Sequence, residues 1–146
     1  MIELTDSMSY GQPAAAIFAV LADLAGYPAW QDAVESADLV DGPLRVGARV
    51  RQTRKAMGWR GQVDVTVTEF VPDERLTLAT DDGTTPGVRQ SYQLTSEGDG
   101  CRVNYQLALD GVPKVFEPLV RAQLHHQVPR MLRRLGEMAA ATAARS

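Results

Sequence analysis

Several polar side chains occupy positions that, by the alternation of their segments, face the same way as apolar residues. They are Gln52, Arg54, Glu69, Thr80, Gln90, Tyr92 and Tyr105. A mostly apolar pocket that holds a few convergent polar groups is the usual form of a small-molecule site. The pattern therefore predicts a ligand site built from this set. All of its members except Glu69 and Thr80 are candidates for direct ligand contact.

The same set offers the groups that an aldol-type cyclisation needs, which are a base beside a carbonyl and donors that stabilise the enolate. The candidate catalytic bases are His125 and Glu69. The candidate donors are Arg54, Tyr92 and Tyr105. A second interpretation stays open, because strand-end polar residues often face water at the rim of a sheet. Buried tyrosines, likewise, often serve only as core aromatics.

The C-terminal segment contributes Leu124 and one of two histidines to the predicted site. Adjacent helical positions diverge by about 100°, so His125 and His126 cannot face inward equally. The pattern favours His125, which follows Leu124 near the apolar stripe. Trp59, beside a predicted hairpin, is interpreted as a wall of the site, whereas Trp30 is interpreted as a core anchor.

The remaining residue inventory argues against other chemistry. One cysteine and two adjacent histidines give no spacing suited to a metal site, and the glycine-rich phosphate and dinucleotide fingerprints are missing, so we expect no metal and no cofactor. The net charge of −3 favours no nucleic-acid partner. The longest apolar run, Ala14 to Ala22, is too short to span a membrane. The single cysteine favours a reducing, cytoplasmic location.

Hydrophobic periodicity predicts one α+β domain over residues 1–146. The predicted strands are Ile2–Tyr10, one near Asp38–Val40, Ala48–Met57, Trp59–Phe70, Arg75–Thr80, Val88–Thr95 and Arg102–Leu109. The predicted helices are Ala14–Leu24, a short one reaching about Ala33 and a long one from Val115 to about Thr142. Pro129 should kink or split the long helix. Short loops between successive strands indicate an antiparallel meander, and the long helix covers its apolar face.

Five stretches carry a family resemblance in addition to the first strand. They are Pro13–Asp23, Tyr27–Trp30, Val46–Val50, Val67–Pro72 and Gly100–Val103. With this order of elements, the chain resembles the START-like helix-grip superfamily, in its branch of polyketide cyclase/dehydrase and lipid-transport proteins that includes coenzyme Q-binding relatives. The resemblance implies a bent antiparallel sheet of about seven strands wrapped around a long C-terminal helix. It also implies two short helices after the first strand and an apolar cavity between sheet and helix.

The resemblance further implies that the cavity binds or transports a hydrophobic small molecule, such as a lipid, a quinone or a polyketide-like compound. The alternative is a cofactor-free polyketide cyclase or dehydratase that uses polar residues of the cavity. The superfamily has no universal catalytic motif, so no residue here inherits a catalytic role from it. A monomer and a homodimer are both compatible with the sequence.

Overall fold

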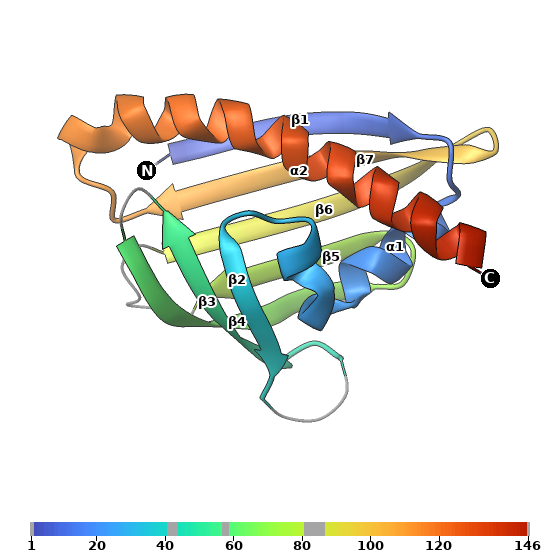
Figure 1. The fold of residues 1–146 in the computed structure, drawn as a ribbon, viewed down its shortest axis with the longest axis horizontal. Helices are drawn as coiled ribbons and strands as arrows, with labels where there is room; N and C mark the ends of the chain where they lie inside the picture. Colours follow the sequence, from blue (N-terminus) through green and yellow to red (C-terminus); the bar gives the residue numbers. More distant parts are fainter. Residues whose placement is uncertain (1, 41–43, 57–58, 81–86, 146) are drawn as a thin grey trace.

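The computed structural model describes residues 2–40, 44–56, 59–80 and 87–145. Within them the chain forms seven strands, two α-helices and two short 3₁₀ helices (Figure 1). In chain order these are β1 (Ile2–Tyr10), α1 (Ala14–Ala22), η1 (Leu24–Ala29), β2 (Val34–Leu39), β3 (Arg49–Ala56), β4 (Trp59–Val71), β5 (Arg75–Thr80), β6 (Gly87–Glu97), β7 (Gly100–Asp110), η2 (Lys114–Phe116) and α2 (Glu117–Arg145).

The seven strands form one antiparallel sheet in the order β1-β7-β6-β5-β4-β3-β2. Strands β2 to β7 pair in the order in which they follow along the chain, and β1 closes the far edge against β7. The long helix α2 lies across one face of this sheet (Figure 1). The predicted fold class, a seven-stranded antiparallel sheet gripping a C-terminal helix, is confirmed.

Two helical predictions need adjustment. The first helix ends at Ala22, because Asp23 leaves helical geometry with φ −84° and ψ 79°. The predicted second helix is the 3₁₀ segment η1, which ends at Ala29 and contains a proline. Pro129 does not split α2, which continues from Glu117 to Arg145. The helix bends along its length (Figure 1), and a proline inside a helix is a known cause of such a bend.

The C-terminal half of α2 is the part that packs closely on the sheet. Leu132 and Leu135 are fully buried there. Gly136 makes room for the ring of Tyr10 on β1, since a Cβ at this position would lie 2.6 Å from Tyr10 Cδ1. The Tyr10 hydroxyl also donates a hydrogen bond to the Leu132 carbonyl over 2.7 Å. This contact fixes the helix near its midpoint, whereas Leu119 near its N-terminal end is 56% exposed.

Candidate functional site

A cavity of about 590 Å³ lies between the N-terminal half of α2 and the inner face of the sheet. Its size falls within the range of small-molecule pockets. Strands β3, β6 and β7 supply part of the wall, and the segment after η1 supplies another part. Most of the side chains that line the cavity are apolar, including Val88, Leu107, Leu109, Val120, Leu124 and Met131.

Aromatic side chains run from η1 to β7 along one side of the cavity. The ring centroids of Tyr27 and Trp30 are 4.9 Å apart, and those of Trp30 and Tyr92 are 6.2 Å apart. Tyr92 in turn lies 5.0 Å from Tyr105. Burial raises the pKa of Tyr92 and of Tyr105 well above the ordinary tyrosine value. Both hydroxyls therefore stay protonated at neutral pH.

Arg54 brings a positive charge into this largely apolar surrounding. The alternation of β3 aims it inward, beside Gln52, and its Nε donates a hydrogen bond to Gln52 Oε1 over 2.8 Å. Burial lowers the pKa of the guanidinium, and the nearby hydroxyls of Tyr105 and Tyr92 partly offset this effect. An arginine stays charged at neutral pH even so.

The structure brings together four of the predicted ligand-contacting residues. The side chains of Arg54, Gln90, Tyr105 and Leu124 all line the cavity. Gln52 and Tyr92 are fully buried and support the wall from behind, and the Tyr92 hydroxyl accepts a hydrogen bond from Gln31 over 3.2 Å. Trp59 begins β4, and its side chain lies outside the residues that the structure describes.

His125 does not face the cavity, contrary to the prediction. Its side chain is exposed, as is that of His126. The cavity side of α2 carries Gln123 and Gln127, and His125 is two positions from each. At about 100° per residue it therefore points about 160° away from both. The prediction placed His125 by the core stripe alone, but the helix presents one face to the core and a neighbouring face to the cavity.

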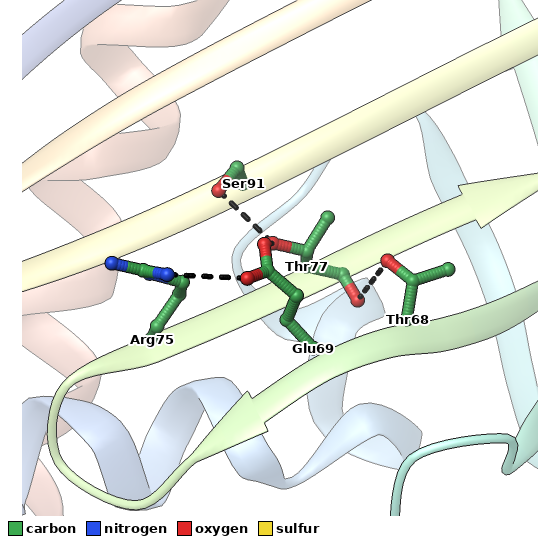
Figure 2. Close-up of polar contacts among 5 residues, drawn as sticks. All are labelled: Thr68, Glu69, Arg75, Thr77 and Ser91. Carbon is green, nitrogen blue, oxygen red and sulfur yellow. Dashed lines mark hydrogen bonds and ion pairs between the residues drawn. The ribbon is translucent and has the colours of Figure 1, made fainter.

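Glu69 lies on the outer face of the sheet, so the prediction that it faces inward is also wrong. The register of β4 against β5 shifts between Val67 and Glu69, which is the signature of a β-bulge that reverses the alternation beyond it. Glu69 is paired with Thr77, whose hydroxyl donates to Glu69 Oε1 over 2.9 Å (Figure 2). Arg75 Nη1 lies 3.2 Å from the other carboxylate oxygen. The hydrogen bonds from Thr77 and Arg75 hold the pKa of Glu69 below its ordinary value.

The sequence patterns did not predict several other residues that line the cavity. Trp30 is fully buried, as expected of a core anchor, yet it also borders the cavity. Asp32 stands at the rim, where its carboxylate pairs with Arg134 at 2.5 Å and Arg130 at 3.8 Å. These residues follow η1 or lie on α2. Only the three-to-four residue spacing of Gln123, Gln127, Arg130 and Arg134 along α2 marked a second helix face in the sequence.

Three further features concern metal binding, membrane crossing and the cysteine. Within the described ranges, no group of three or more histidine, cysteine, aspartate or glutamate side chains is placed to bind a metal ion. None of the helices in the described part of the chain is long and apolar enough to cross a membrane. The only cysteine, Cys101, is buried in β7 and carries a free thiol.

A bent sheet that grips a long helix over an apolar cavity defines a class of helix-grip proteins, and comparison with known proteins agrees with this class. The family model described as polyketide cyclase/dehydrase and lipid transport matches residues 1–141. The chain therefore belongs to this family. A sequence comparison with curated proteins gave no match.

Solved structures share the fold over nearly the whole chain. The protein TTHA0849 from Thermus thermophilus superposes with a TM-score of 0.78 at 21% identity, covering 97% of this chain and 99% of that one. A START superfamily protein from Mycobacterium smegmatis gives a TM-score of 0.79 at 14% identity, covering 96% and 98%. The major latex-like protein 151 from Panax ginseng gives 0.67 at 13% identity, covering 90% and 94%. At such identities the likeness establishes the fold alone.

Proposed function

We propose that this protein binds a hydrophobic small molecule, such as a lipid, a quinone or a polyketide-like compound, between the sheet and the N-terminal half of α2. The observation that carries the proposal is the cavity of about 590 Å³ with its largely apolar wall. Apolar surface that leaves water there contributes about 25 cal/mol per Å² before the costs of association. Phe116 and Leu119, 53% and 56% exposed, also line the cavity and offer apolar contacts to a ligand that enters.

A cyclase or dehydratase, the alternative, needs a base that reaches the substrate. His125 is exposed away from the cavity, and Glu69 lies on the opposite face of the sheet. Among the described residues that line the cavity, the one carboxylate is that of Asp32, and two arginines hold it. This arrangement favours passive binding or transport over proton abstraction.

The cavity can be filled from α2 to test the proposal. Replacing Leu124→Trp adds a large side chain at a lining position, so we expect the affinity for the neutral probe N-phenyl-1-naphthylamine to fall by about 10-fold or more. Probe fluorescence, titrated at constant protein concentration, gives the dissociation constant. Circular dichroism of each variant confirms that the fold is kept.

The neighbouring position supplies a matched control. His125→Trp introduces the same side chain one residue along the helix, on an exposed face, and we expect it to leave probe affinity unchanged. If the unmodified protein fails to bind the probe, or if both tryptophan variants bind it as well as the unmodified protein does, the cavity is not the binding site and the proposal is wrong.

A further inference from the structure

Arg54 is a charged group without an anionic partner among the described residues. Across residues 2–40, 44–56, 59–80 and 87–145, no carboxylate pairs with its guanidinium, whose hydrogen bond goes to the neutral amide of Gln52. Other cations of β3 differ in this respect. Arg51 Nε lies 3.1 Å from Asp64, and Lys55 Nζ lies 4.0 Å from Glu35. Among these cations of β3, Arg54 is thus the one whose charge has no anionic partner among the described residues.

Three buried hydrogen-bonding groups in or behind the same cavity wall have no protein partner among the described residues. The indole Nε1 of Trp30 and the amide Nε2 of Gln52 are donors without an acceptor among the described residues, although both side chains are fully buried. Gln90 Oε1 is an acceptor in the same condition, and its residue is 6% exposed. Native proteins rarely leave such groups unpaired, because each forgoes the hydrogen bonds it would make with water. Of the residues that line the cavity, Trp30 and Arg54 offer donors and Gln90 offers an acceptor, which suits a ligand that carries acceptors.

The charges along the wall agree with this interpretation. Without Lys55, whose charge pairs with Glu35, three cations and one carboxylate line the cavity among the described residues, although the whole chain has a net charge of −3. They are Arg54, Arg130, Arg134 and Asp32. A locally positive concavity on an otherwise acidic protein attracts anions.

We propose that the ligand is a hydrophobic carboxylate whose head group binds Arg54 and whose apolar body lies along Leu107 and Leu124. The guanidinium presents paired N–H donors that match the two oxygens of a carboxylate. Trp30, which carries an unpaired indole donor, lines the same cavity, and Gln52 stands behind the wall, hydrogen-bonded to Arg54. This inference rests on the proposed binding function and narrows it from hydrophobic molecules in general to anionic amphiphiles.

Dodecanoate and dodecan-1-ol, two probes with the same alkyl chain, test the inference. Each is titrated into the protein by isothermal titration calorimetry. We expect the unmodified protein to bind dodecanoate about 10-fold or more tightly than dodecan-1-ol, a ratio that a charged hydrogen bond in a buried site readily gives. Arg54→Met should remove this preference by weakening dodecanoate alone, while dodecan-1-ol affinity stays within about 2-fold.

Arg51→Met is the matched control, because it removes the same charge from the same strand on the outer face. It should leave both affinities unchanged. Equal binding of the two probes by the unmodified protein would overturn the carboxylate inference while leaving the proposed function standing. Binding of neither probe would overturn the carboxylate inference, and the titration with N-phenyl-1-naphthylamine would still decide the proposed function. The comparison of probes on the unmodified protein decides the matter even if Arg54→Met fails to fold.

Discussion

On the outer face of the sheet, a cluster of polar side chains hydrogen-bond to one another. On the inner face, several hydrogen-bonding groups and the charge of Arg54 have no partner of this kind among the described residues. The outer-face cluster comprises Thr68, Glu69, Arg75, Thr77 and Ser91 (Figure 2). Its central hydroxyl, on Thr77, lies 2.9 Å from the Glu69 carboxylate and 3.0 Å from the Ser91 hydroxyl. The cavity cluster comprises Trp30, Gln52, Arg54 and Gln90, and three of its buried polar atoms have no partner among the described residues.

The difference separates polar groups that stabilise the fold from polar groups kept for a ligand. A paired cluster loses stability when one member is removed, because its partner is left without a hydrogen bond. An unpaired cluster costs stability while it is empty, so its removal should be neutral or favourable. Functional sites commonly lower stability in this way. The sign of the change in unfolding free energy is therefore the test that tells the two clusters apart.

The largest change in stability is expected on the outer face. Thr77 is fully buried there, and Thr77→Val keeps its shape while removing the hydroxyl that donates to Glu69. We expect the free energy of unfolding to fall by about 1 kcal/mol, the net contribution of a typical intramolecular hydrogen bond. Urea unfolding measures it. Thr95→Val, an exposed position on the same face of β6, is the control and should have no measurable effect. Equal losses for both variants would contradict a stabilising role for the cluster.

A smaller change of opposite sign is expected in the cavity. The double variant Gln52→Leu/Arg54→Met removes both partners of the 2.8 Å hydrogen bond and replaces them with apolar side chains of similar length. We expect the free energy of unfolding in the absence of ligand to stay the same or to rise by about 1 kcal/mol. Thermal and urea unfolding report this change. A marked loss of stability would show that the cavity cluster is structural, and the contrast between the two faces would disappear.

The same two faces show which parts of the structure could be predicted from the sequence. Strict alternation placed Gln52 and Arg54 inward correctly, because β3 pairs with β4 in one unbroken register from Arg49 to Ala56. On β4 the alternation failed at Glu69, since a bulge depends on how two strands fit together and leaves no mark in the period of one strand. The strands and the long helix were predictable because their apolar periods are long and regular.

The error at His125 has a different origin. The apolar stripe of α2 identifies the face that meets the core, and Leu132 and Leu135 are indeed fully buried. The face that meets the cavity carries Gln123 and Gln127, whose polarity makes it resemble a solvent face. A helix that packs on the core and also lines a cavity has two inward faces. Only the face that packs on the core is hydrophobic enough to be recognised from the sequence.

The smallest expected effect concerns the charge of Glu69. Its pKa in the folded protein is below its ordinary value of 4.5, because Thr77 and Arg75 hydrogen-bond the ionised form. A carboxyl with a depressed folded pKa adds stability above its unfolded pKa, and this contribution is lost as the pH falls through the folded value. Glu69→Gln removes that contribution. We therefore expect the unmodified protein to be slightly more stable than the variant at pH 6, with the difference shrinking steadily below the ordinary value of 4.5.

Urea unfolding of both proteins across this pH range measures the difference. Both partners are at the surface, where ion pairs contribute little, so the difference at pH 6 should be small. Glu97→Gln is a suitable control for the loss of one outer charge, because Glu97 accepts a hydrogen bond from the exposed Ser9 hydroxyl and is not a member of the outer-face cluster. A difference for Glu69→Gln that stays constant from pH 6 downward would mean that its ionised form is not what the outer-face cluster stabilises. The pairing that distinguishes this face from the cavity would then rest on the Thr77 hydroxyl and its neutral neighbours.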